Sequence, residues 1–176
     1  MKRTVMISSL VVLAVVIAFS VFLGTRQPVS QATNVQSPLL GKVAPSFAGQ
    51  DLSGGQLNLT SDRGHIVVVN FWASWCGPCV QEAPDLSTFA WQERHDNVDV
   101  IGVVFDDTVS AAANFEKYYG SLYPSIVDAN GEIANRYGVT APPTTFVINA
   151  QGRVAVSLVG SVTTKQLTQV VNRLRG

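Results

Sequence analysis

Two cysteines three positions apart are the residues of this sequence best suited to chemistry. They are Cys76 and Cys79, separated by Gly77 and Pro78, and the chain of 176 residues has no other cysteine. A disulfide between them closes so short a loop that loop-closure entropy gives it little value as a structural link. Such a pair is better suited to opening and closing, which is the chemistry of thiol–disulfide exchange.

The expected position of Cys76 makes it the more reactive of the two thiols. The β-branched run at residues 66–71 predicts a buried strand, and a helix is expected to start at the cysteines. Free backbone N–H groups and the helix dipole favour a thiolate there, with a pKa near ~7 or below against about 8.5 for an ordinary thiol. We therefore expect Cys76 to attack a substrate disulfide and Cys79 to resolve the mixed disulfide.

Other uses of a cysteine pair fit the sequence less well. A tetrahedral zinc site needs four ligands, and the only histidines, His65 and His95, are both expected at the surface. A copper-binding metallochaperone needs a nearby histidine or methionine, yet Met1 and Met6 both belong to the N-terminal segment. A peroxidase needs its reactive cysteine in a different loop context. The prediction is a redox-active disulfide with no cofactor and no metal.

Composition narrows the class of partner. Hydrophobic residues make up 47% of the chain, and twelve basic residues balance twelve acidic ones. Neither sign of charge forms a long run, whereas phosphate binding needs a clustered basic face. Nucleic acid is therefore not expected as a partner, and the length allows one domain with an appendage.

Residues 1–26 are expected to anchor the chain in a membrane. Lys2 and Arg3 precede an apolar run at residues 5–23, which is long enough as a helix to cross a ~30 Å hydrocarbon core. A cleavable signal peptide has a shorter apolar stretch of roughly 7–15 residues, although Ser-Gln-Ala at 30–32 leaves cleavage and secretion as the alternative. The charges place the N-terminus in the cytoplasm and the remainder of the chain outside it.

The rest of the chain divides into a linker and one domain. Residues 27–38 are polar and predict a flexible linker, so the domain is expected at residues 39–176. Thr163 and Gln166 predict a capping box at the start of the last helix. The expected elements are a hairpin at 47–59, strands at 66–71, 98–105, 125–127, 144–148 and 154–158, and helices after the cysteines, at 108–119, at 132–137 and after 163. This order predicts an α/β fold with a central mixed sheet flanked by helices.

The residues around the cysteines resemble a known motif. Residues 72–79, Trp-Ala-Ser-Trp-Cys-Gly-Pro-Cys, resemble the thioredoxin active site almost letter for letter. The wider pattern resembles the membrane-tethered TlpA/ResA/CcmG branch of that superfamily, through the N-terminal apolar segment, the hairpin, Glu-Ala-Pro at 82–84 and the stretch at 137–148. The resemblance covers residues 39–176 and implies a thioredoxin-like fold with a strand–helix insertion at residues 121–136.

The resemblance also assigns further site residues. Pro143 matches the proline whose preceding peptide bond is cis and which faces the cysteines. Asn70 stands where the superfamily has a buried aspartate, so Glu82 becomes the nearest carboxylate that could take the proton from Cys79. A solvated glutamate on the helix surface is the alternative for Glu82. The residues expected to contact substrate are Trp75, Gly77, Pro78, Pro142 and Thr144, the last of which replaces a glutamate common in relatives.

A direction of reaction and two partners are implied as well. The resemblance implies reduction of extracytoplasmic protein disulfides, for example in apocytochrome c before haem attachment, with electrons from a membrane-embedded thiol donor. The Gly-Pro dipeptide between the cysteines occurs in reducing thioredoxins with E°′ of about −270 mV, whereas DsbA-like oxidants lie near about −120 mV. A disulfide oxidase or isomerase of secreted proteins is the alternative.

Overall fold

The computed structural model describes residues 13–19, 31–62 and 64–176. The chain forms two compact units, one ending at Ser30 and the other running from Gln31 to Gly176. Residues 13–19 are helical, and no helix among the described residues is both long and apolar enough to span a membrane. Most of the span expected at residues 5–23 lies outside the described residues, so the membrane anchor stays a prediction.

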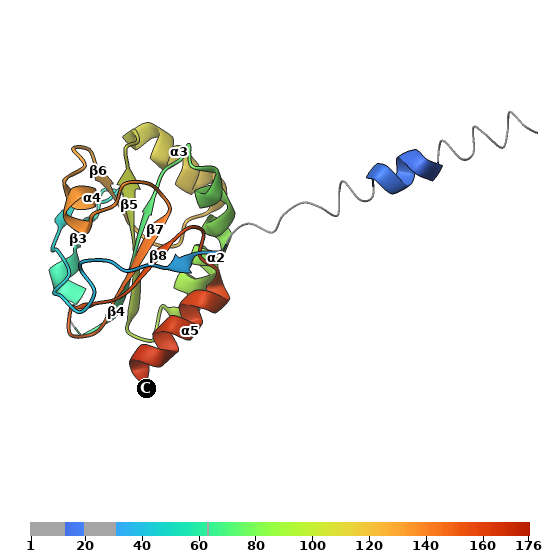
Figure 1. Cartoon of the computed structure of the whole chain (residues 1–176). Coiled ribbons are helices and arrows are strands. Elements are labelled where there is room, and N and C mark those ends of the chain that lie inside the picture. The colour runs from blue at the N-terminus through green and yellow to red at the C-terminus, as the bar shows by residue number, and fades with distance from the viewer. Residues whose placement is uncertain (1–12, 20–30, 63) are drawn as a thin grey trace, which may run out of the picture. The chain divides into compact units, whose positions relative to one another are not determined.

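The second unit is built on a six-stranded mixed sheet in the order β1-β8-β7-β4-β5-β6 (Figure 1). The parallel strands are β4 (Ile66–Trp72), β5 (Val98–Phe105) and β6 (Ser125–Asp128). Next to β4, β7 (Thr144–Ile148) runs antiparallel, followed by β8 (Val154–Val159) and the short edge strand β1 (Thr33–Asn34). A separate hairpin of β2 (Ala48–Gln50) and β3 (Gln56–Asn58) precedes the 3-10 helix η1 (Leu59–Asp62). The mixed sheet and the N-terminal hairpin confirm the sequence prediction.

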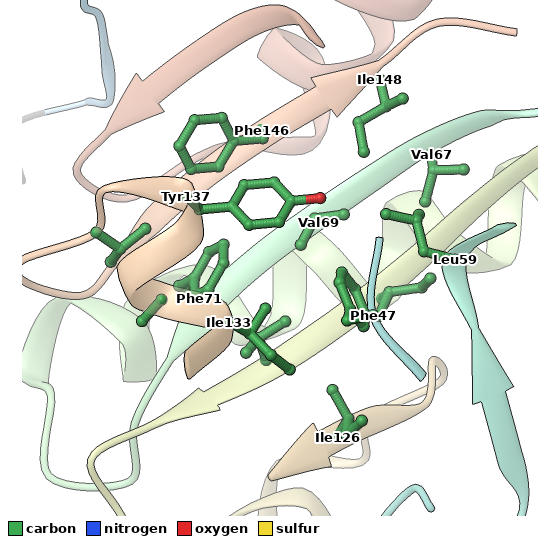
Figure 2. Close-up of a cluster of buried hydrophobic side chains, with 14 of the residues drawn as sticks. Phe47, Leu59, Val67, Val69, Phe71, Ile126, Ile133, Tyr137, Phe146 and Ile148 are labelled. Atoms are coloured by element: carbon green, nitrogen blue, oxygen red, sulfur yellow. The ribbon is translucent and has the colours of Figure 1, made fainter. Parts of the chain in front are cut away.

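Helices cover both faces of the sheet, which explains why every residue of β4 is buried. Side chains alternate along a strand, so Val68 packs with α2 (Gly77–Glu93) and α5 (Thr164–Arg175) on one face. On the other face, Val69 packs with α4 (Glu132–Tyr137) and the hairpin, and Figure 2 shows this cluster around Tyr137. The succession of β6 and α4 confirms the strand–helix insertion.

The helix expected at residues 108–119 starts and ends at the capping residues that the sequence predicts. α3 (Val109–Tyr119) starts after Thr108, whose hydroxyl accepts a hydrogen bond of 3.2 Å from the Ala111 N–H. It ends at Gly120, whose φ of 71° lies in the left-handed region that favours glycine. These local signals are sufficient to fix both ends of the helix.

The domain begins earlier than the expected boundary at residue 39. Thr33 pairs with Val159 and Asn34 with Leu158, so residues 31–38 of the expected linker belong to the folded unit. Residues 27–30 lie outside the described residues. The prediction failed because strand pairing uses backbone groups, so even a polar segment can cover the otherwise unpaired edge of β8.

The capping box at α5 is only half formed. The Thr163 hydroxyl accepts a hydrogen bond of 3.2 Å from the Gln166 N–H, as predicted. The Gln166 side-chain amide, however, donates to the Ala32 carbonyl at 2.8 Å instead of turning back to Thr163. The early start of the domain supplies this competing acceptor.

Candidate active site

Cys76 and Cys79 form a disulfide at the N-terminus of α2. Cys76 is the N-cap of the helix, and its sulfur accepts a hydrogen bond of 3.2 Å from the Cys79 N–H. Pro78 fits in the first turn because an N–H at that position has no partner inside the helix. The same backbone N–H and the helix dipole would stabilise a Cys76 thiolate after reduction.

The loop that follows β5 holds the segment that leads from β4 to the cysteines. The Ser74 N–H donates to Oδ2 of Asp107 at 2.7 Å, and the Trp75 indole donates to the Asp106 carbonyl at 2.9 Å. Trp75 remains 58% exposed, so its ring is oriented yet open to solvent directly before Cys76. The site therefore combines a fixed backbone with an accessible flat surface.

Trp72 has a structural position beneath the site. It is buried, its indole donates to Oγ of Ser125 at 3.3 Å, and its ring lies 4.7 Å from that of Phe115. Gly102 makes room for this arrangement, because a Cβ there would lie 2.6 Å from the Trp72 indole nitrogen and 2.2 Å from Ser125 Oγ. The packing of Trp72 thus depends on a glycine in the neighbouring strand.

The peptide bond between Pro142 and Pro143 is cis, as the resemblance implied. Thr144 pairs with Phe71 in the antiparallel register of β7 and β4, which brings Pro143 level with the end of β4, where the chain leads to the cysteines. The cis-proline and the disulfide therefore meet at one end of the sheet.

The residues expected to contact substrate do not all reach the surface. Gly77 and Pro78 are exposed and Pro142 is half-buried. Thr144 is buried, and its hydroxyl donates to the Ala141 carbonyl at 2.9 Å. A contact between the Thr144 side chain and a substrate is therefore not supported, because β7 is covered on both faces.

Glu82 is a buried carboxylate rather than a solvated residue on the helix surface. Its side chain is 1% exposed, and Oε1 accepts a hydrogen bond of 2.9 Å from the Asn70 amide. Its other oxygen, Oε2, accepts one of 2.9 Å from the Val162 N–H. Burial raises the pKa of Glu82 from 4.5 to about 7, and these two hydrogen bonds only partly oppose it. A carboxyl with this pKa can give or take a proton near neutral pH.

Asn70 can pair with either protonation form of Glu82. Its Nδ2 donates to Glu82 and, at 3.0 Å, to the Thr145 hydroxyl, while Oδ1 has no hydrogen-bond partner among the described residues. Rotating the amide by about 180° would turn Oδ1 toward Glu82 as an acceptor for a protonated carboxyl. An aspartate at position 70 would lack a donor for the ionised form.

Sequence reasoning missed a loop that touches three parts of the site. In residues 160–162, here called the clamp loop, the Gly160 N–H donates to the Pro143 carbonyl at 3.0 Å. The Ser161 hydroxyl donates to the Pro78 carbonyl at 2.9 Å, and Val162 binds the Glu82 carboxylate as described above. Two of these donors are backbone N–H groups, and no residue type in the sequence signals their position.

The structure places the histidines away from the cysteines. His65 precedes β4, at the end of the strand opposite Trp72, and its Nδ1 lies 2.6 Å from Oδ2 of Asp99. Within the part of the chain that the structure describes, no three His, Cys, Asp or Glu side chains are grouped so that they could hold a metal ion.

The chain is similar to known proteins in both sequence and structure. The model of the AhpC/TSA family matches residues 40–157. The thiol-disulfide oxidoreductase ResA of Bacillus thuringiensis is 35% identical over 135 residues, which cover 77% of this chain and 78% of that protein. The ResA protein of Bacillus subtilis is 30% identical over 135 residues, with 77% and 75% of the two chains covered.

Solved structures show the same fold. A thioredoxin-family thiol:disulfide interchange protein from Chlorobium tepidum superposes with a TM-score of 0.72 at 27% identity, covering 81% of this chain and all of that chain. A putative thiol:disulfide interchange protein DsbE from the same organism gives a TM-score of 0.70 at 29% identity, with 76% and 96% of the chains covered.

Proposed function

The chain belongs to the AhpC/TSA family and is a thioredoxin-like thiol–disulfide oxidoreductase of the ResA type, and we propose that it reduces protein disulfides outside the cytoplasm. The observation that carries the proposal is the disulfide between Cys76 and Cys79 at the N-terminus of α2, with a buried carboxyl on the same helix. The Gly-Pro dipeptide between the cysteines favours the reducing direction.

The proposed reaction moves two electrons in two exchange steps. The Cys76 thiolate attacks one sulfur of the substrate disulfide, that S–S bond breaks, and the second substrate sulfur leaves as a thiolate. The Cys79 thiolate then attacks the Cys76 sulfur, which re-forms the Cys76–Cys79 disulfide and releases the first substrate sulfur. The substrate is reduced and the protein is oxidised, so a thiol donor must reduce the pair before the next cycle.

Glu82 has the proposed role of accepting the proton from Cys79. It follows Cys79 by three residues on α2, a spacing that puts both side chains on one face of the helix. A pKa of about 7 leaves enough ionised carboxylate at neutral pH to take a thiol proton. Deprotonation would make Cys79 a nucleophile at the moment when the mixed disulfide needs to be resolved.

The location and the partners rest on the sequence and on the relatives. The two positive charges and the apolar run at residues 5–23 support an N-terminal membrane anchor with the domain outside the cytoplasm. A membrane-embedded thiol donor would then supply electrons, and an apocytochrome c with an oxidised Cys-x-x-Cys-His segment is the proposed substrate.

Trapping the mixed disulfide tests this proposal. The variant Cys79→Ser lacks the resolving thiol, so it should accumulate a disulfide between Cys76 and an oxidised Cys-x-x-Cys-His peptide, detected by mass spectrometry. The variant Cys76→Ser is the matched control and should form no adduct. Equal adduct formation by both variants, or by neither, would refute the assigned roles.

A further inference from the structure

The clamp loop follows one face of the active-site helix. Its hydrogen bonds reach Pro78 and Glu82 of α2, and the Thr164 N–H beyond the loop donates to Oδ1 of Asp85 at 2.8 Å. Positions 78, 82 and 85 are four and three residues apart, so they lie above one another on the helix. The clamp loop and Thr164 therefore hold the first turns of α2, which begin directly after Cys76 and contain Cys79.

Ser161 is the one residue of the clamp loop that holds the site through its side chain. It is buried, and the hydrogen bond from its hydroxyl ends at Pro78, between the two cysteines. The Gly160 and Val162 contacts use backbone N–H groups, which no substitution other than proline removes directly. A change at Ser161 can thus loosen the loop without deleting a group that touches Glu82.

The N-terminal segment at residues 31–35, here called the strap, holds Ser161 from the other side. The Ala32 N–H donates to the Ser161 carbonyl at 2.8 Å, and the Ala32 carbonyl accepts from the Gln166 amide at 2.8 Å. Farther along, the Val35 N–H donates to the Ser157 carbonyl at 3.0 Å. Ala32 is itself buried among core side chains, so the strap is packed as well as hydrogen-bonded.

We propose that Ser161, held by the strap, is a positioning residue that keeps the Val162 N–H on the Glu82 carboxylate and the Pro78 turn in place. This inference rests on the proposed function of Glu82 as the proton acceptor. It makes the strap part of the working site, although its residues lie far from the cysteines in sequence.

The groups around Glu82 determine how a weaker Val162 contact changes its pKa. The Val162 and Asn70 hydrogen bonds stabilise the ionised carboxylate, whereas burial and the negative charge of Asp85 destabilise it. Tyr123 faces Glu82 from the segment before β6, and burial raises its pKa so that it stays neutral. Cys79 becomes titratable only after reduction. Loosening the Val162 contact therefore raises the Glu82 pKa.

The test is a titration of Glu82 in the full chain, held in detergent micelles with the disulfide oxidised. The ¹³C shift of the Glu82 carboxyl is followed against pH in wild type and in Ser161→Ala. We expect Ser161→Ala to raise the midpoint by roughly one pH unit, the size expected when a hydrogen bond to a charged group weakens. The pH midpoint of disulfide exchange by the reduced protein should move by the same amount.

Two variants serve as controls. Ser161→Thr keeps the hydroxyl and should titrate as wild type does. Ser157→Ala removes another buried serine, in β8 just before the clamp loop. Its neighbours Val156 and Leu158 both face the α2 side, so Ser157 points to the other face of the sheet. This variant should leave the Glu82 midpoint unchanged.

Each outcome decides the proposal. An unchanged midpoint in Ser161→Ala overturns it. If Ser161→Ala does not fold, Gln166→Ala removes only the side-chain tie to the strap and should raise the midpoint by a smaller amount, and no change would again overturn the proposal. If wild type shows no exchange at any pH, the proposed function fails, while the carboxyl titration still decides the positioning role.

Discussion

The Asn70 side chain donates a hydrogen bond of 2.9 Å to the Glu82 carboxylate, across the interface between β4 and α2. The position that the resemblance matches to a buried aspartate thus holds an amide, and the buried carboxyl lies on the helix that begins at the cysteines. We expect this buried carboxyl to contribute to the pH dependence of both the stability of the fold and the exchange reaction.

The pH dependence of stability should report the Glu82 pKa. The folded-state pKa of about 7 exceeds 4.5, the ordinary value expected in the unfolded chain. The contribution of Glu82 to stability is therefore complete below about pH 4.5 and is lost as pH rises through 7. The shift corresponds to about 3 kcal/mol as an upper bound. In urea unfolding of the oxidised protein, Glu82→Gln should therefore gain stability over wild type at pH 8 and differ little at pH 5.

Glutamine is a suitable replacement at this position. With the Asn70 amide rotated, the glutamine can donate to Asn70 Oδ1 and still accept from the Val162 N–H. If Glu82→Gln and wild type differ in stability by the same amount at pH 5 and at pH 8, Glu82 does not titrate in this range.

The same substitution should slow exchange. Without a proton acceptor near Cys79, the resolving step should lose roughly 10²-fold in rate at pH 7, the lower end of what general bases contribute. Stopped-flow measurement of the release of substrate thiol from the mixed disulfide gives this rate directly. A rate and pH profile equal to those of wild type would remove Glu82 from the mechanism.

Gly102 should be intolerant of a methyl group. Gly102→Ala would place a Cβ 2.2 Å from Ser125 Oγ and 2.6 Å from the Trp72 indole nitrogen. The resulting displacement should cost roughly 1–3 kcal/mol in thermal or urea unfolding. Gly77→Ala is the matched control, because no described atom lies within 4 Å of its added Cβ apart from chain neighbours and the helix's own backbone. If both variants unfold like wild type, the proposed steric role of Gly102 is wrong.

Local patterns in the sequence were enough to predict much of the site. The placement of Cys76 follows from an apolar strand and a helix start, and both are determined within a few residues. The cis bond at Pro143 came from the resemblance, since base rates alone favour trans. For Glu82 the sequence left two alternatives, a buried carboxylate or a solvated one, because its environment depends on the distant Val162 N–H.

The parts that sequence could not predict depend on backbone groups. Val162 and Glu82 are 80 positions apart, and a peptide N–H carries no residue-specific signal. The strap was mistaken for a linker because it has few large apolar side chains, while its pairing with β8 uses backbone hydrogen bonds. Thr144 was expected to contact substrate, yet the sheet is covered on both faces there.

The reduction potential of the Cys76–Cys79 pair tests the central claim most directly. It is obtained by equilibrating the protein with glutathione or dithiothreitol at pH 7 and quantifying the reduced fraction by alkylation and mass spectrometry. A protein that reduces disulfides should have a value below roughly −230 mV. A value near −120 to −150 mV would contradict the proposal and identify an oxidase or isomerase of secreted proteins.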